Sequence, residues 1–247
     1  MLCPVCAGPC IPLDAVDFNK SCDAAGSRRL GPAGISVSYV LCSTCGYCFA
    51  PELSAWTPEE FGARIYNDEY LLVDPDYIEI RPRANAASLL AMFGDRALSI
   101  EHLDYGGGSG LLAQLLRASN WQSVSYDPFV NRNVGVEQLG RFDLITAFEV
   151  FEHAPDVRKL MSNLRFLLSP DGIVLFSTLL SDGKVQPGQS LDWWYAAPRN
   201  GHISLHSRNS LAILAQQHGL HLGSLSPGFH VFYTAVPPWA DHLIRPE

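Results

Sequence analysis

The sequence predicts an α/β fold with a mostly parallel sheet, preceded by a small cysteine-rich domain. A short apolar stretch from Ile100 to Asp104 leads into a turn containing four glycines, and residues 111–117 then have the apolar spacing of a helix. Apolar runs alternate with helical segments after this point, which is the pattern of strand–helix–strand units. All seven cysteines precede residue 49. Together these observations place the sheet in the second part of the chain and a separate module at its start.

Residues 1–55 are predicted to form a zinc-ribbon-like domain. Two Cys-x-x-Cys pairs, Cys3 with Cys6 and Cys42 with Cys45, each put two thiolates on one tight turn, and two such turns complete a tetrahedral Zn²⁺ site. An odd, clustered set of cysteines argues against a disulfide framework and for a reducing compartment. The site would be structural, with an iron–sulfur cluster as the alternative. The remaining cysteines, kept as alternative ligands, are Cys10, Cys22 and Cys48.

Residues 56–92 are predicted to form a helical linker. Thr57 is a helix-capping residue, Pro58 suits the first helical position, and two glutamates follow in the first turn. Residues 84–93 have the pattern of an amphipathic helix that leads to the first strand of the sheet. The remaining residues, 93–247, would form the α/β domain.

The turn from Gly106 to Gly110, called the glycine elbow here, predicts an anion-friendly pocket. A strand, a glycine turn and a helix N-terminus direct amide N–H groups and the positive end of the helix dipole at one point. The dinucleotide fingerprint requires a third glycine at position 111, which is Leu111, so that fingerprint fails. Asp127 follows the next predicted strand, residues 123–126, where its carboxylate would accept both hydroxyls of a ribose.

The second half of the chain supplies the remaining elements. The segment 128–141 is too short for the usual third strand, and no adenine-binding residue is predicted. The near-continuous apolar run 142–148 predicts a central strand. The further predicted elements are a helix at 156–168, a strand at 173–179, a helix at 208–218 and a terminal hairpin of 221–225 with 229–236.

Asp104-x-Gly106-x-Gly108-x-Gly110, with Asp127 in register, resembles the first motif of class I S-adenosylmethionine-dependent methyltransferases. The segment from Glu149 to His153 resembles the Glu-Val-x-Glu-His segment of many small-molecule methyltransferases. The resemblance implies a Rossmann-like, seven-stranded methyltransferase sheet and S-adenosylmethionine as cofactor. The cofactor-binding residues that it implies are Asp104, Gly106, Gly108, Gly110, Asp127, Phe148 and Glu149.

The cysteine module in front narrows the resemblance to sugar and natural-product methyltransferases that carry an N-terminal zinc-binding domain. These include sugar C-methyltransferases that act on nucleotide-linked ketosugars, in which a Tyr-His-Glu-His run supplies the base. The matching stretch here runs from Arg199 to His202, and only its last histidine is retained. The resemblance therefore implies a natural-product or sugar-modifying enzyme, without establishing its acceptor.

The favoured reaction is methyl transfer to a hydroxyl of a small acceptor, such as a sugar or nucleotide sugar. His202 is the preferred general base because the pKa of histidine lies near working pH, with His206 and His153 as further candidates. A metal site made of His202 and His206 is rejected, because residues 203–205 alternate as extended chain. The predicted acceptor-binding residues are Tyr70, Trp193, Trp194, Tyr195 and Arg199. The alternatives are C-methylation of a ketosugar and a non-catalytic zinc-ribbon module that binds a protein partner.

Composition excludes other classes of protein. The formal net charge is −8 and no segment concentrates Lys or Arg, which argues against a nucleic-acid partner. No apolar run approaches the length of a membrane span, and the N-terminus lacks a signal-peptide pattern. We therefore expect a cytoplasmic enzyme with a small-molecule partner and no membrane association, and the sequence makes no prediction of oligomeric state.

Overall fold

The computed structural model describes residues 1–22 and 30–244, which divide into two compact units. Both units are assembled from segments that are not consecutive in the sequence. The first unit contains Met1–Pro75, Phe151–Arg158 and Leu179–Leu214, and the second contains Asp76–Val150, Lys159–Thr178 and Ala215–Glu247. The division of the sequence into domains at residues 55 and 92 stays a prediction.

The first unit is built on a small antiparallel sheet with the strand order β1-β2-β3-β8. These strands are β1 (Cys10–Asp17), β2 (Ser36–Cys42), β3 (Cys48–Phe49) and β8 (Ser204–Leu205). The short helices are α1 (Pro51–Ser54), α2 (Pro58–Arg64) and α3 (Tyr70–Val73), with 3₁₀ turns η4 (Phe151–His153) and η5 (Pro198–Asn200). Thr57 and Glu60 form a reciprocal capping box at the start of α2, which confirms the predicted helix start.

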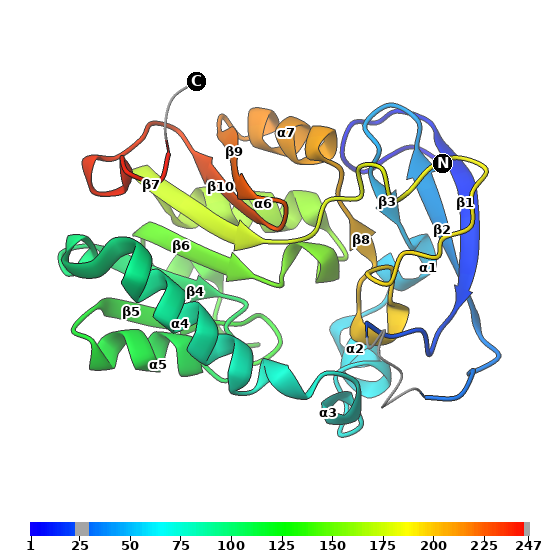
Figure 1. Ribbon diagram of the computed structural model, residues 1–247, viewed down its shortest axis with the longest axis horizontal. Helices are drawn as coiled ribbons and strands as arrows, with labels where there is room; N and C mark the ends of the chain where they lie inside the picture. The colour runs from blue at the N-terminus through cyan, green and yellow to red at the C-terminus, as the bar shows by residue number, and fades with distance from the viewer. Residues whose placement is uncertain (23–29, 245–247) are drawn as a thin grey trace. The chain divides into compact units, whose positions relative to one another are not determined.

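The second unit contains a six-stranded mixed sheet with the order β5-β4-β6-β7-β10-β9 (Figure 1). The strands are β4 (Glu101–Tyr105), β5 (Gln122–Tyr126), β6 (Phe142–Phe148), β7 (Leu168–Ser177), β9 (His221–Ser226) and β10 (Phe229–Tyr233). β5, β4, β6 and β7 run parallel, and β10 is antiparallel to both β7 and β9. The predicted α/β fold and its terminal hairpin are confirmed.

Six strands stand in this sheet where seven were expected, because the described chain has no strand between β5 and β6. Residues 128–141 contribute only the 3₁₀ turn η3 (Val136–Gln138). A parallel strand needs a crossover of about a dozen residues on each side, and this segment must itself return the chain to β6. The expected absence of the third strand is confirmed, and the expected seven-stranded sheet is corrected to six.

The helices of the second unit are α4 (Ile80–Phe93), η2 (Gly94–Ala97), α5 (Leu111–Ala118) and η6 (Pro238–Ala240). The residues of α6 (Val157–Leu167) and α7 (Arg208–Gln217) are divided between the two units. Leu89 of α4 and Leu116 of α5 belong to the same buried cluster as Leu144 and Leu175 of the sheet. Each of these leucines is fully buried, which contributes about 1.5–3 kcal/mol per side chain. This core anchors α5, which follows the glycine elbow, against the sheet.

No helix within the described ranges is both long and apolar enough to cross a lipid bilayer. α4 has 14 residues, whereas a membrane-spanning helix needs about 20.

Candidate functional site

The glycine elbow connects the end of β4 to the start of α5 in the second unit. Gly106, Gly108 and Gly110 have φ values of 76°, 53° and 77°, a left-handed region that other residues enter at an energetic cost. Gly110 is the N-cap of α5, so the elbow opens directly onto a helix N-terminus. The predicted glycines therefore lie together, and the backbone conformation itself requires them.

Gly107 is one of the four glycines of the predicted turn, although the sequence assigns it no contact with the cofactor. Its φ is not positive, but a Cβ at this position would collide with the Asp104 carboxylate and the Ser125 hydroxyl. The motif Asp104-x-Gly106-x-Gly108-x-Gly110 specifies every second residue, so it does not include Gly107. The run of three consecutive glycines, residues 106–108, was the available signal.

Asp127 lies immediately beside the elbow. Its Oδ2 accepts a hydrogen bond from the Gly108 amide at 3.0 Å, and its Oδ1 accepts one from the Phe129 amide at 2.8 Å. Amide donors of this kind fix the orientation of a carboxylate. Asp127 is partly exposed at the end of β5, so the structure brings it together with the predicted glycines.

Asp104 is buried at the end of β4, where it joins a chain of polar side chains. The Thr146 hydroxyl donates to Asp104 Oδ1 at 3.0 Å, and the same hydroxyl lies 3.0 Å from His102 Nε2. Burial raises the pKa of Asp104 to about 7, with a further increase from the negative charge of Asp127, whereas the Thr146 hydrogen bond lowers it. Asp104 is therefore close to its titration point near neutral pH.

His102 continues this chain, which crosses the sheet from β4 to both neighbouring strands. Its Nδ1 lies 2.7 Å from the Ser123 hydroxyl, and the side chain is fully buried. Burial lowers the pKa of His102 to about 3, so the imidazole is neutral at physiological pH. The Thr146 hydroxyl donates its proton to Asp104, so it can only accept from His102 Nε2. His102 therefore carries its proton on Nε2 and accepts from the Ser123 hydroxyl at Nδ1.

Glu149 and Phe148 lie at the end of β6. Glu149 has a φ of 54°, which is uncommon for a residue with a side chain. The Ser177 hydroxyl stabilises this conformation, because it accepts from the Glu149 amide at 2.9 Å and donates to Oε1 at 3.0 Å. Phe148 stacks on Phe229 with ring centroids 5.5 Å apart. Sparsely populated backbone conformations of this type concentrate at ligand sites.

A histidine pair lies in the first unit. His202 is buried, and its Nδ1 lies 2.8 Å from the Tyr195 carbonyl oxygen, which can only accept. Nδ1 therefore donates, and in the neutral form of the ring Nε2 would carry the lone pair. The ring of His153 lies edge-on to it, with centroids 4.8 Å apart, and His153 Nδ1 contacts the Tyr66 hydroxyl at 3.2 Å. The structure thus brings together two of the three predicted catalytic histidines.

Gly201 allows this close packing. Its φ is 86°, and a Cβ there would lie 3.0 Å from both His153 Nδ1 and the Tyr66 hydroxyl. Gly201 is therefore a packing requirement of the histidine pair.

Glu152 completes a cluster with His153 and His202, in which one donor atom of each residue lies within 4.8 Å of the others. Glu152 is fully buried, and the Tyr195 hydroxyl donates to its Oε1 at 2.5 Å. Glu152 belongs to the segment from Glu149 to His153, and the sequence predicts no role for it. Its position directly before His153 was the only sequence signal.

His206 lies outside this cluster. It is fully buried, packs against the rings of Tyr47 and Phe151, and its Nε2 lies 3.3 Å from the Phe151 carbonyl oxygen. These contacts are those of a core histidine, and a catalytic role for His206 stays a prediction.

The predicted acceptor-binding residues differ in exposure. Trp194 is 45% exposed, whereas Tyr70 and Tyr195 are buried. Tyr195 packs between Trp193, at 5.1 Å between ring centroids, and His202, at 4.3 Å. Tyr70 directs its hydroxyl to the Asn200 carbonyl oxygen at 3.3 Å. Of this set, Trp194 presents the largest accessible ring surface.

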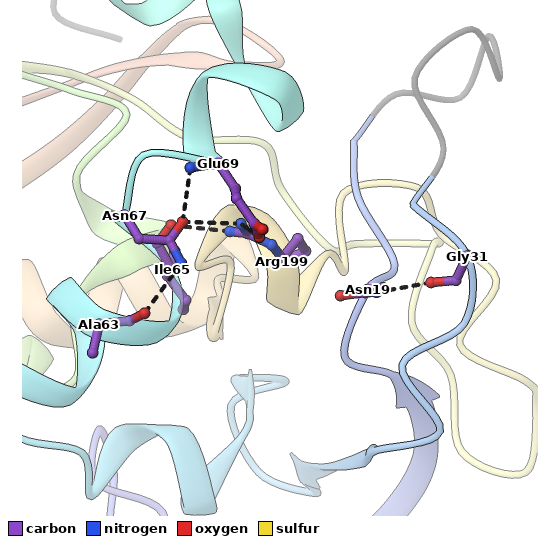
Figure 2. Close-up of polar contacts among 7 residues, drawn as sticks. All are labelled: Asn19, Gly31, Ala63, Ile65, Asn67, Glu69 and Arg199. Carbon is purple, nitrogen blue, oxygen red and sulfur yellow. Dashed lines mark hydrogen bonds and ion pairs between the residues drawn. The ribbon is translucent and has the colours of Figure 1, made fainter.

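Arg199 is 2% exposed, and its guanidinium binds the turn that follows α2 (Figure 2). Its Nη1 donates to the Ile65 carbonyl oxygen at 2.9 Å, and its Nη2 lies 3.3 Å from Asn67 Oδ1 and 3.7 Å from Glu69. A buried guanidinium with these partners serves the local fold. The predicted contact with a substrate phosphate therefore finds no support in this geometry.

Four cysteines converge in the first unit. Cys3 Sγ lies 3.6 Å from Cys45 Sγ, and Cys6 Sγ lies 3.4 Å from Cys42 Sγ. All four sulfur atoms form one group with metal-ligand spacing. In tetrahedral Zn²⁺ sites with bonds of about 2.3 Å, sulfur atoms lie roughly 3.8 Å apart, so the donor set fits such an ion. The predicted four-cysteine cluster is confirmed, and Cys10, Cys22 and Cys48 lie outside it.

Backbone amides support the same four sulfurs. Val5 donates to Cys3 Sγ at 3.3 Å, Gly8 donates to Cys6 Sγ at 3.4 Å, and the Cys45 amide donates to Cys42 Sγ at 3.4 Å. A hydrogen bond from Cys45 lowers the pKa of Cys3 to about 5, against the opposing effect of burial. Burial instead raises the pKa of Cys10 to about 12. Within the cluster, however, burial raises the pKa of Cys6, and the hydrogen bond with Cys3 raises that of Cys45, so a bound ion would have to displace these protons.

Comparison with known proteins identifies the α/β region. Residues 77–225 match a family model described as a methyltransferase domain. The ubiquinone biosynthesis O-methyltransferase of Rhodopseudomonas palustris is 33% identical over 116 residues, which cover 38% of this chain and 44% of that protein. The enzyme of the same name from Chromobacterium violaceum is 31% identical over 132 residues, which cover 43% and 57% of the two chains. The chain thus spans about half the length of these curated relatives.

Solved structures show the same fold at low sequence identity. An O-methyltransferase family protein from Burkholderia thailandensis aligns with a TM-score of 0.52 and 15% identity, covering 76% of this chain and 67% of that one. The 1,6-didemethyltoxoflavin-N1-methyltransferase of the same organism, solved with S-adenosylhomocysteine, aligns with a TM-score of 0.50 and 17% identity, covering 83% and 96%. The family match spans more than half of the chain, and the chain therefore belongs to the S-adenosylmethionine-dependent methyltransferase family, here with a four-cysteine cluster near its N-terminus.

Proposed function

We propose that this chain transfers a methyl group from S-adenosylmethionine to a hydroxyl of a small acceptor, such as a sugar or nucleotide sugar. The observation that carries the proposal is the fixed orientation of His202, whose Nδ1 donates to the Tyr195 carbonyl at 2.8 Å. This bond holds the imidazole in the tautomer whose Nε2 accepts a proton. A family member with an oriented histidine base has the parts that hydroxyl methylation requires.

The glycine elbow would hold the methionine portion of the cofactor. Asp104, Gly106, Gly108 and Gly110 supply a carboxylate and a backbone without obstructing Cβ atoms, and the Asp127 carboxylate suits the ribose hydroxyls. Phe148 and Glu149 complete this set at the end of β6. The cofactor itself supplies an activated methyl carbon on a sulfonium leaving group. The protein therefore has to align the acceptor oxygen and remove its proton.

On the acceptor side, His202 is the proposed base and His153 its neighbour. Tyr195 positions both His202, through its carbonyl, and Glu152, through its hydroxyl. Trp194 offers an exposed aromatic face of the kind that covers sugar rings, with Trp193 and Tyr70 as further acceptor contacts. The relatives are named O-methyltransferases, which favours oxygen as the methylated atom. C-methylation of a ketosugar is the less favoured reaction.

The four-cysteine cluster would hold a structural Zn²⁺ ion. A closed set of four thiolates leaves no open coordination position, so the ion would stabilise the fold of the first unit without taking part in chemistry.

The first test is binding of S-adenosylhomocysteine to the zinc-loaded chain by isothermal calorimetry. We expect one site per chain, and Asp127→Ala should weaken binding roughly tenfold to a hundredfold, because hydrogen bonds to a charged group contribute about 1.5–3 kcal/mol. Incubation with labelled S-adenosylmethionine and a panel of sugars, nucleotide sugars and phenols would then identify the acceptor. Absence of binding heat in the folded protein would refute the proposal.

A further inference from the structure

We propose that Glu152, His153 and His202 form a second metal site, which takes a divalent transition-metal ion of the zinc class. The inference goes beyond methyl transfer and does not depend on it. The three residues lie in the first unit, and one donor atom from each lies within 4.8 Å of the others. They are separate from the four-cysteine cluster, which is complete without them.

The donor set determines the class of ion. Two imidazoles and one carboxylate are a recurrent set for Zn²⁺ sites that keep an open coordination position. Imidazole nitrogens favour zinc, iron, nickel and copper over Mg²⁺ and Ca²⁺, which prefer oxygen ligands. An ionised Glu152 would also offset half of the charge of a divalent ion. The site therefore favours a transition metal with one or more positions left for water or a ligand.

Each of the three residues is held by an outer partner, which is the arrangement that orients metal ligands. His202 donates from Nδ1 to the Tyr195 carbonyl at 2.8 Å, so its Nε2 carries the lone pair. His153 Nδ1 lies 3.2 Å from the Tyr66 hydroxyl, and donation to that oxygen gives His153 the same tautomer. The Tyr195 hydroxyl holds Glu152 Oε1 at 2.5 Å. Tyr195 thus orients two of the three ligands.

The backbone fixes the cluster further. The Ile203 amide donates to the Glu152 carbonyl oxygen at 2.9 Å, which ties the 3₁₀ turn η4 to the segment that carries His202. Gly201 permits the close approach of His153, as described above. A tetrahedral ion with bonds of about 2.0–2.1 Å needs donor atoms roughly 3.3 Å apart. Binding an ion therefore requires the three donor atoms to move closer together than the 4.8 Å within which they lie here.

A bound ion and a proton would compete for the same nitrogen. His202 is the proposed base, so an ion at this site should slow methyl transfer while leaving cofactor binding unchanged. This competition gives the site a readout in turnover as well as in metal content.

The test is a calorimetric titration of Zn²⁺ into the full chain that has been loaded with one equivalent at the cysteines. We expect one further equivalent to bind in the wild type, and at least tenfold weaker binding in Glu152→Gln and in His202→Gln. His221→Gln removes an exposed histidine from β9 and serves as the matched control, with wild-type binding of the second ion expected.

Two measurements guard against a variant that misfolds. Retention of the cysteine-bound ion, measured by mass spectrometry, reports on the first unit, and binding of S-adenosylhomocysteine reports on the second. A wild type that binds only one ion would overturn the inference, as would full binding of the second ion by both cluster variants. A chain that takes the second ion but does not bind S-adenosylhomocysteine would refute the proposed function and leave the metal site standing.

Discussion

Two buried histidine networks, one in each unit, show how similar residues come to serve different purposes. His102 in the second unit is fully buried, and hydroxyls of Ser123 and Thr146 contact its two nitrogens. His202 in the first unit binds a backbone carbonyl through Nδ1 and lies beside a second imidazole and a carboxylate. In the network of His102, the polar side chains of neighbouring strands hydrogen-bond to one another. The second concentrates lone pairs and negative charge, which is the arrangement that acid–base chemistry or a metal ion requires.

Substituting glutamine for His202 or for His102 should distinguish the two networks, and the largest difference is expected in turnover. His202→Gln removes the proposed base, so kcat should fall roughly 100- to 10,000-fold. The affinity for S-adenosylhomocysteine should stay at the wild-type value, because the elbow is untouched. Turnover is measured as S-adenosylhomocysteine formation with the acceptor found in the screen. Wild-type turnover in this variant would remove His202 from the mechanism, and His221→Gln is the control for loss of any histidine.

A smaller effect is expected from Gly107→Ala, which disturbs the Asp104 end of the first network. The added Cβ would press on the Asp104 carboxylate and the Ser125 hydroxyl. Overpacking of this kind costs about 1–3 kcal/mol, so S-adenosylhomocysteine should bind roughly tenfold to a hundredfold more weakly in calorimetry. Gly31→Ala is the matched control, because its Cβ would enter open space at an ordinary φ. Equal affinities in the two variants would contradict the assignment of Gly107 to the elbow.

The smallest effect concerns stability and its dependence on pH. His102→Gln should lower the free energy of unfolding by about 1–3 kcal/mol near pH 7, since it disturbs two buried hydrogen bonds. The lowered pKa of His102, about 3 against 6.5 in the unfolded chain, gives stability that is present above pH 6.5 and lost as pH falls toward 3. The difference between wild type and variant should therefore grow with pH, by up to about 1.4 kcal/mol per unit.

In both the wild type and His102→Gln, ionisation of Asp104 changes the free energy of unfolding in the opposite direction to that of His102. Its raised pKa, about 7 against 3.8, gives stability that is present below pH 3.8 and lost as pH rises through 7. The two groups oppose each other between about pH 4 and 6.5, so the wild type should have the flatter profile. Urea unfolding at a series of pH values measures both curves. A difference that is constant with pH would show that His102 is not held neutral by the fold.

Local sequence signals were sufficient for the elbow and for most of the fold. Gly106, Gly108 and Gly110 could be read from consecutive residues because their chemistry is a property of the backbone, and backbone conformation depends on near neighbours. The same holds for the capping box at Thr57 and for the missing third strand, which follows from segment length alone. The two Cys-x-x-Cys pairs can also be recognised from the sequence, because both cysteines of each pair lie on one turn.

Only the tertiary structure decided which polar residues share a site. Glu152 and His202 are 50 positions apart, and nothing in their local patterns links them, yet Tyr195 holds both. Arg199 reads as a substrate contact in sequence but is buried against the turn after α2, and His206 reads as a base but packs in the core. Burial and long-range contacts fix the role of a side chain, whereas the sequence by itself determines only what the backbone can do locally and which chemistry is available.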